Sequence, residues 1–295
     1  MSSVIQRVRN PGGTQETGAV EPGNPTGLTA WDRVKLARHP DRPHTLDYID
    51  ELMTDFVELH GDRVFGDDHA LIGGLANFAG RTVIVIGHQK GRDTKENIYR
   101  NFGMARPEGY RKAERLMRHA AKFGLPVVTF IDTPGAEPGI GSEERGQSTA
   151  IAESLLTMAG LRTTIVAIVI GEGGSGGALA IGVADRVLML ENAIYSVASP
   201  EASATILWKD VARAADAASS MKITALDLYG FGMIDEIVPE EHPAHERPRE
   251  VMSAAGSAIR RHLGDLHAQI QQENGMDELV QHRYEKFRRI GAWTE

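Results

Sequence analysis

The chain has 295 residues, and 41% of them are hydrophobic, enough for one large α/β domain with a buried core. Its 40 acidic and 32 basic residues give a net charge of −8, which argues against a general binder of nucleic acids or anionic membranes. The absence of cysteine excludes disulfides, cysteine zinc ligands and a thiol nucleophile, and it fits a cytoplasmic protein. The longest apolar runs fall far short of the ~20 residues that a membrane helix needs.

Residues 1–28 are rich in Gly, Pro, Thr and Glu without an apolar period, so we expect a disordered lead. Residues 29–295 are expected to form a single domain whose C-terminal part, from about residue 245, is helical. Within that domain, segments 71–78 and 81–87 alternate around an Ala-Gly turn and predict two consecutive strands.

A basic segment spans residues 90–118, with nine Lys or Arg against four Asp or Glu. It indicates either a landing site for an acidic or phosphate-bearing partner or a solvated helix face, and the sequence leaves both open. Within it, Pro107 at the start, the apolar spacing that follows and the stop at Gly124 predict a helix over residues 107–123.

Two strand, loop and helix units follow in succession. The apolar segment 126–131 leads into the loop DTPGAEPGIG at 132–141, and the apolar segment 163–170 leads into the glycine run GEGGSGGAL at 171–179. The helix predicted over 147–161 connects them. Strands joined by such a crossover are usually parallel neighbours, and ligands bind at their carboxyl ends. We therefore expect the two loops to lie side by side.

The glycine run fits three functional patterns. Gly171, Gly173 and Gly176 match a dinucleotide fingerprint, and Glu191 stands where a ribose-binding acid would. Glycine runs match such patterns by chance, so this match alone is weak.

The second pattern is a nucleophile elbow centred on Ser175, with Asp235 and His242 or His245 downstream in the order of a catalytic triad. The third is an oxyanion hole made of backbone N–H groups at the start of the helix after the run. A glycine turn suits this third role because its backbone can approach a ligand closely.

Segments 87–109, 129–147, 169–182 and 199–209 together closely resemble the carboxyltransferase α subunit of bacterial, biotin-dependent acetyl-coenzyme A carboxylase, and the resemblance runs from about Trp31 to about Trp293. It implies an α/β fold of the ClpP/crotonase type, a spiral of strand, strand and helix units with C-terminal helices. It also implies transfer of the carboxyl group from carboxybiotin to acetyl-CoA, giving malonyl-CoA.

The resemblance further implies a set of partners. These are a β subunit with a zinc ribbon and the CoA site, a biotin carboxyl carrier protein, and an α2β2 assembly. Biotin would arrive on the carrier, with no cofactor bound covalently to this chain and no metal site in it. The alternatives are a stand-alone or pathway-specialised crotonase-like acyl-CoA carboxyltransferase or decarboxylase, and a non-catalytic paralogue that binds a partner.

Under this resemblance, backbone N–H groups of the two loops stabilise the developing oxyanion, and we expect them at Gly176, Gly177, Ala178, Gly135 and Ala136. The biotin pocket is expected to involve Gly173, Gly174, Pro134 and Glu137. His88 and Lys90 are expected near the partner surface.

The sequence departs from the family pattern in three places. The helical region that usually precedes the domain is largely replaced by the lead, Glu137 stands where an aromatic is usual, and Ala202-Ser203 replace Gly-Cys. Because carboxybiotin is an anion, we expect Glu137 to face away from the biotin pocket, toward solvent or a cation such as Arg145.

Overall fold

The computed structural model describes residues 27–291. Residues 1–26 of the lead predicted for residues 1–28 therefore lie outside the described residues. Within them, eight strands form one sheet in the order β1-β2-β3-β4-β5-β6-β8, and β7 pairs with the end of β5. The β1–β2 and β2–β3 pairs are antiparallel and all later pairs are parallel. The strands are β1 (Thr54–Glu58), β2 (Leu71–Phe78), β3 (Arg81–His88), β4 (Val127–Thr133), β5 (Ile165–Gly174), β6 (Arg186–Leu190), β7 (Ile194–Ser196) and β8 (Glu236–Val238).

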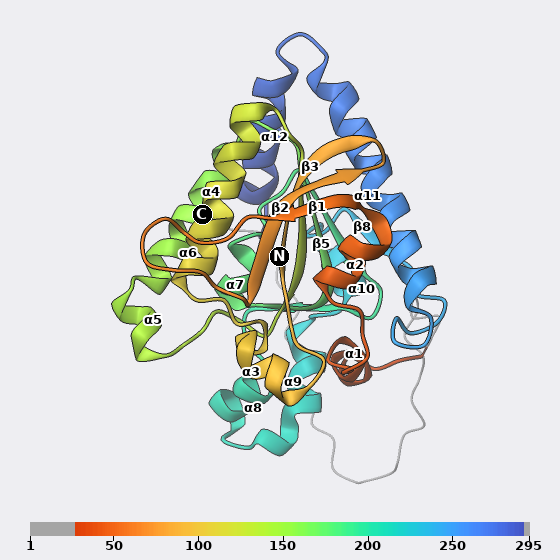
Figure 1. Ribbon diagram of the computed structural model, residues 1–295. Coiled ribbons are helices and arrows are strands. Elements are labelled where there is room, and N and C mark those ends of the chain that lie inside the picture. The colour runs from red at the N-terminus through yellow and green to blue at the C-terminus, as the bar shows by residue number, and fades with distance from the viewer. Residues whose placement is uncertain (1–26, 292–295) are drawn as a thin grey trace, which may run out of the picture.

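Helices cover both faces of the sheet (Figure 1). One face carries α4 and α6, which pack against each other, and the other carries α2 and α11. The remaining short helices gather around the carboxyl ends of the strands or form the C-terminal arm. The helices are α1 (Ala30–Ala37), α2 (Thr45–Leu52), α3 (Thr94–Tyr99), α4 (Pro107–Phe123), α5 (Ile140–Glu144), α6 (Gln147–Gly160), α7 (Ser175–Leu179), α8 (Pro200–Trp208), α9 (Ala214–Met221), α10 (Ala225–Gly230), α11 (Pro248–Ile270) and α12 (Gly275–Arg288).

The central strands are apolar because helices cover them on both sides. Every residue of β4 and β5 is buried, as expected for parallel strands between two helical layers. The strand pair expected around the Ala79-Gly80 turn is the antiparallel β2–β3 hairpin, and the predicted helix 107–123 is α4, which ends at Gly124 in the left-handed conformation. These parts of the fold follow the sequence pattern closely.

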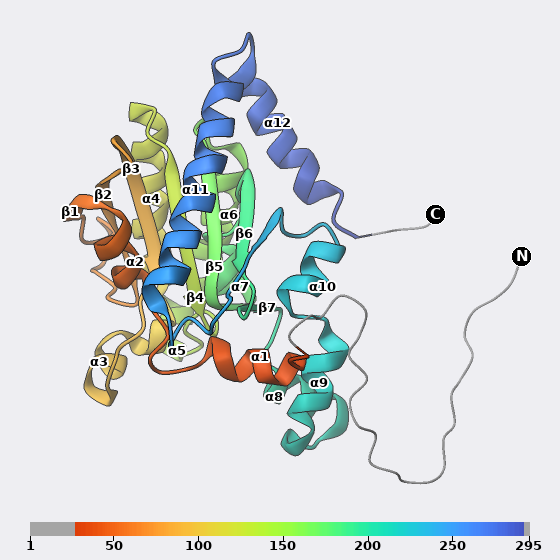
Figure 2. The ribbon, with the colours of Figure 1, turned by 90° about the vertical axis from the view of Figure 1, so that its right-hand side faces the viewer.

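The C-terminal helices α11 and α12 form a hairpin that extends past the end of the sheet (Figure 2). Arg283 of α12 is fully buried and anchors the hairpin through two bonds to the Asp185 carboxylate. It also donates to the carbonyls of Met158, Leu161 and Thr163. Over residues 27–291, no helix combines the length and apolar character that crossing a bilayer would need.

Candidate active site

The glycine run is the end of a strand followed by a helix, as the sequence suggested, but the strand is longer than predicted. β5 continues to Gly174, because Gly173 pairs with Thr133 on one side and with Tyr195 of β7 on the other. Ser175, with φ of 51°, then begins α7. The apolar segment ends at Ile170 but the strand does not, because glycines carry no side-chain pattern from which β pairing could be predicted.

The loops after β4 and β5 lie against each other, as expected for neighbouring parallel strands. A Cβ atom on Gly174 would lie 2.1 Å from the Pro134 carbonyl oxygen, and one on Gly177 would lie 2.7 Å from the Ala136 backbone nitrogen. Both glycines are therefore required by the close approach of the two backbones. Gly176 differs, because a Cβ there would meet only Ile151, at 3.7 Å.

Hydrogen bonding distinguishes among the five expected N–H donors. The Gly135 N–H donates to the Thr133 hydroxyl at 3.1 Å, so it already has an acceptor. With its N-cap at Gly174, α7 begins at Ser175, so the N–H groups of Gly176 and Gly177 come before Ala178, the first position that could find an acceptor inside the helix. Among the described residues, the N–H groups of Ala136, Gly176 and Gly177 have no such acceptor. Ala136 and Gly177 lie in contact where the loops meet, and Gly176 precedes Gly177 in the chain.

Two further contacts hold the first loop in place. The Gln147 side-chain amide donates to the carbonyls of Ala105 and Glu137, both at 2.9 Å, and the Glu137 N–H donates to the Ala105 carbonyl at 3.0 Å. Gln147 is itself buried. The loop is thus fixed from the start of α6, which leaves the Ala136 N–H in a defined position.

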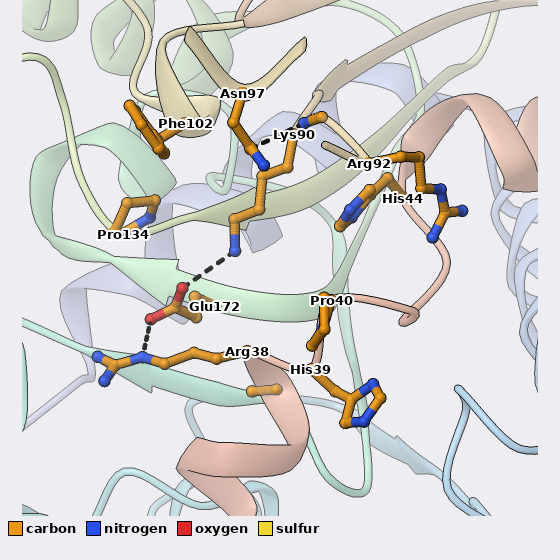
Figure 3. Close-up of a pocket in the computed structure, with 12 residues that line it drawn as sticks. Arg38, His39, Pro40, His44, Lys90, Arg92, Asn97, Phe102, Pro134 and Glu172 are labelled. Carbon is orange, nitrogen blue, oxygen red and sulfur yellow. Dashed lines mark hydrogen bonds and ion pairs between the residues drawn. The ribbon is translucent and has the colours of Figure 1, made fainter. Parts of the chain in front are cut away.

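Two cavities flank the glycine turn. One, of about 710 Å³, has mainly apolar walls. Its lining includes Ser175 and Gly176 from the turn, together with Leu179, Tyr195, Val197, Ile223 and Phe231. The other, of about 300 Å³, is polar and is drawn in Figure 3; it is lined in part by Pro134, Glu172, Lys90, Arg38 and Arg92. The turn therefore has one apolar and one charged neighbour.

Charged side chains below the turn form a continuous network. Glu172 of β5 lies between Lys90, at 3.0 Å, and Arg38, at 2.6 Å, as Figure 3 shows. Lys90 also binds Asp132 at 2.7 Å, and His44 lies 3.1 Å from the other oxygen of that carboxylate. Burial alone would raise the pKa of Asp132, but the Lys90 charge and the His44 hydrogen bond hold it well below its usual range.

The basic segment divides between the fold and the surface: Arg92, Lys95, Arg106 and Arg118 are exposed, whereas other basic residues are engaged internally. Lys112 is completely buried and binds the Asp67 carboxylate and the Asp68 carbonyl. Arg111 pairs with Asp62 at 2.8 Å. Much of this segment's charge therefore stabilises the fold internally, and these pairings connect residues more than 40 positions apart that no local pattern reveals.

His88 corrects another expectation. It is completely buried rather than at a partner surface, and among the described residues its ring lies beside the backbone of Gly177 and Phe130. Burial, with a smaller contribution from the Lys90 charge, lowers the pKa of His88 to about 4, against the opposing influence of Asp132. The ring is therefore neutral at pH 7. Lys90 reaches the polar cavity, with its side chain largely enclosed.

The residues expected to form the biotin pocket separate in the structure. Pro134 lines the polar cavity, whereas Gly173 is covered by the Tyr195 ring and Gly174 by the Pro134 backbone. The Glu137 carboxylate turns to the Ser142 hydroxyl, and Arg145 pairs with Glu108 instead. Glu137 is not among the described residues that line either cavity. The apolar lining of the larger cavity was missed, because its residues are scattered over 175–290.

The residues of the two rival patterns have other partners. Glu191 accepts the Glu240 backbone N–H at 3.1 Å and lies 3.7 Å from Arg33, so its carboxylate is engaged in the fold. Asp235 accepts the Val187 N–H at 2.6 Å and pairs with Lys286, and His245 stacks on His39. In the described part of the chain, no hydrogen bond connects Asp235, His242 or His245 to Ser175.

Comparison with known proteins decides the family. The model of the acetyl co-enzyme A carboxylase carboxyltransferase-like family matches residues 20–291. The chain belongs to this family. It is 56% identical over 269 residues to the acetyl-coenzyme A carboxylase carboxyl transferase subunit alpha of Geobacter metallireducens, covering 91% of this chain and 83% of that one. It is 58% identical over 265 residues to the same subunit of Geobacillus kaustophilus, covering 90% and 80%.

Solved structures agree on the fold. A transcarboxylase 12S structure matches with a TM-score of 0.59 and 20% identity, covering 77% of this chain and 44% of that one. A Pseudomonas malonate decarboxylase hetero-tetramer in complex with coenzyme A matches at 0.57 and 18%, covering 77% and 90%. The comparisons confirm the family resemblance, the crotonase-like fold and the carboxyltransferase class that the sequence analysis expected.

Proposed function

We propose that this chain provides the biotin-binding half of the acetyl-CoA carboxylase carboxyltransferase site, and that a β subunit provides the CoA-binding half. The two together move a carboxyl group from carboxybiotin on a carrier protein to acetyl-CoA, giving malonyl-CoA. The observation that carries this assignment is that the N–H groups of Ala136, Gly176 and Gly177, which have no acceptor among the described residues, lie where the two loops meet.

These donors fit the charge that the reaction develops. Carboxybiotin supplies the carboxyl group, and negative charge builds on the ureido oxygen of biotin as that group leaves. Backbone N–H groups fixed in place stabilise such an oxygen without having to reorganise, and each donor in a comparable hole contributes about 10²- to 10³-fold in rate. Fixed loops also hold the reacting groups in orientation. The role of this chain is therefore electrostatic and positional.

The apolar cavity fits an uncharged ring system. Its walls are mainly apolar and it opens onto the turn at Ser175 and Gly176, so Leu179 and Tyr195 would hold a biotin ring beside the donors. Glu137, held by Ser142, keeps its negative charge away from this cavity. The residues present thus fit biotin.

Exposed apolar side chains at the same cavity support a protein partner there. Val197 and Phe231 are 83% and 61% exposed, and Leu179 is 42% exposed. Apolar groups exposed together at a cavity mouth are typical of an interface. We infer that the β subunit covers this mouth in an α2β2 assembly and excludes water, and that the carrier delivers biotin to the enclosed site.

One assay tests the proposal. Purified chain is mixed with malonyl-CoA and free biotin, alone and with its β subunit, and acetyl-CoA formation is measured. Activity only with both chains is the expected result. Activity of this chain alone would make it a stand-alone enzyme, and no activity in the complete, assembled complex would make it a non-catalytic partner. Either result overturns the proposal.

A further inference from the structure

The Thr133 hydroxyl makes two hydrogen bonds with the residue that precedes a proposed donor. Thr133 ends β4 and is completely buried. Its hydroxyl donates to the Gly135 carbonyl at 2.7 Å and accepts the Gly135 N–H at 3.1 Å. Both polar groups of Gly135, which has φ of 154°, are thereby fixed by one side chain. The loop leaves the strand in a single conformation.

The Gly135 carbonyl belongs to the same peptide unit as the Ala136 N–H. A hydrogen bond accepted by a carbonyl polarises its peptide and makes the N–H of that peptide a stronger donor. The same bond also fixes the plane in which the N–H points. Through this peptide bond, Thr133 therefore both increases the polarity of the Ala136 N–H and sets the direction in which it points.

The opposite end of the loop is held independently. Gln147 binds the Glu137 carbonyl at 2.9 Å, and Gly177 packs so closely that a Cβ on it would lie 2.7 Å from the Ala136 nitrogen. Thus Ala136 lies between two anchored residues and beside the second loop. Gln147 fixes where the loop ends, and Thr133 fixes how the Ala136 peptide is turned.

We propose that Thr133 is a positioning residue of the carboxyltransferase, which orients and polarises the Ala136 N–H toward the developing oxyanion. The inference rests on the function proposed above, because it requires the Ala136 N–H to be a donor in the reaction. The hydroxyl contacts no substrate. Its effect should appear in the chemical step rather than in the binding of the acyl-CoA, which the β subunit holds.

The test compares three variants in the assembled complex. Thr133→Val removes the hydroxyl and keeps the side-chain shape, and Thr133→Ser restores the hydroxyl. Thr129→Val is the matched control, because Thr129 lies in the same strand, is also completely buried, and donates its hydroxyl to the Ile181 carbonyl at 2.8 Å, in the core. For each, kcat and the KM for malonyl-CoA are measured in the malonyl-CoA and biotin assay.

We expect Thr133→Val to lower kcat on the order of tenfold, less than the 10²-fold or more for a lost donor, because the N–H remains but is less well oriented. KM should stay within about twofold, Thr133→Ser should return kcat to near wild type, and Thr129→Val should leave it within about twofold. If Thr133→Val does not assemble, Thr133→Ala makes the same deletion and is read in the same way.

An unchanged kcat in Thr133→Val, an equal loss in Thr129→Val, or no rescue by Thr133→Ser would overturn the inference. None of these outcomes touches the proposed function, which depends on the donors themselves. That function fails separately, if the Gly177→Val variant, in which the two loops are forced apart, transfers carboxyl at the wild-type rate.

Discussion

The Ala136 backbone nitrogen occupies the space that a side chain on Gly177 would need, since a Cβ there would lie only 2.7 Å away. Two loops separated by about 40 residues in sequence thus meet backbone to backbone. The same Cβ would lie 2.8 Å from the Gly135 carbonyl carbon and 2.9 Å from the Tyr110 hydroxyl. No single side-chain movement can relieve all three contacts, and two of them involve backbone atoms.

Gly177→Val should therefore abolish carboxyl transfer, because the valine side chain separates the two loops and displaces their N–H donors. We expect a loss of at least 10²-fold in kcat with assembly to the β subunit retained. The control is Gly264→Val in α11, where a Cβ meets no atom within 4 Å. The measurements are turnover of malonyl-CoA with biotin, and size-exclusion chromatography of the complex. Wild-type turnover would contradict the oxyanion assignment.

Ser175→Ala should keep turnover within a few fold. Ser175 is exposed at the start of α7, and it contributes its backbone position rather than a bonded hydroxyl. Alanine tolerates a φ of 51° about as poorly as serine, so the turn should persist. The same carboxyl-transfer assay decides the question. A loss of several orders of magnitude would identify the hydroxyl as a nucleophile and restore the elbow interpretation.

The sequence predicts the scaffold of this site better than its electrostatics. Local patterns of apolar spacing, proline and glycine predict the helix over 107–123, the β2–β3 hairpin and the adjacency of the two loops. They do not predict which individual N–H groups are free to act as donors. Gly135 was expected to be a donor, but the Thr133 hydroxyl accepts its N–H, a detail of loop conformation that residue types do not reveal.

The charged network shows a second limit. Arg38, Lys90 and Glu172 come from three distant segments, and Arg38 is separated from Glu172 by 134 residues. In the sequence each charge looks like an ordinary exposed side chain. Only the fold brings the three together, because it packs α1 against β5 and places β3 one strand away from β5, across β4. The family resemblance located the glycine turn, but it gave no information on what lies beneath it.

Arg283→Met should destabilise the chain strongly. Arg283 is completely buried and makes five hydrogen bonds, so its loss removes the only cation bonded to the buried Asp185 side chain and one donor from each of three carbonyls among the described residues. Removing one member of a buried ion pair costs about 3–5 kcal/mol. The control, Arg162→Met, breaks the exposed pair with Asp277 and should cost at most about 1 kcal/mol. Urea unfolding followed by circular dichroism measures both, and equal losses would refute the anchoring role.

His88 should make the stability of the chain depend on mildly acidic pH. Its pKa is lowered to about 4 in the fold, mainly by burial, against the ordinary value of 6.5 expected in the unfolded chain. The unfolded state therefore binds the proton more tightly, so the contribution of His88 is present above pH 6.5 and is lost as the pH falls toward 4. Between pH 7 and pH 5 the loss is about 2 kcal/mol.

His88→Leu, which cannot titrate, should remove this part of the pH dependence, whereas His119→Leu, at an exposed position of α4, should retain it. The charged neighbours Asp132 and Lys90 remain in both variants and in the wild type, so their own titration cancels in the comparison. The measurement is the free energy of urea unfolding at pH 7 and at pH 5 for the three proteins. If His88→Leu loses as much stability on acidification as the wild type does, then the buried imidazole is not the group responsible.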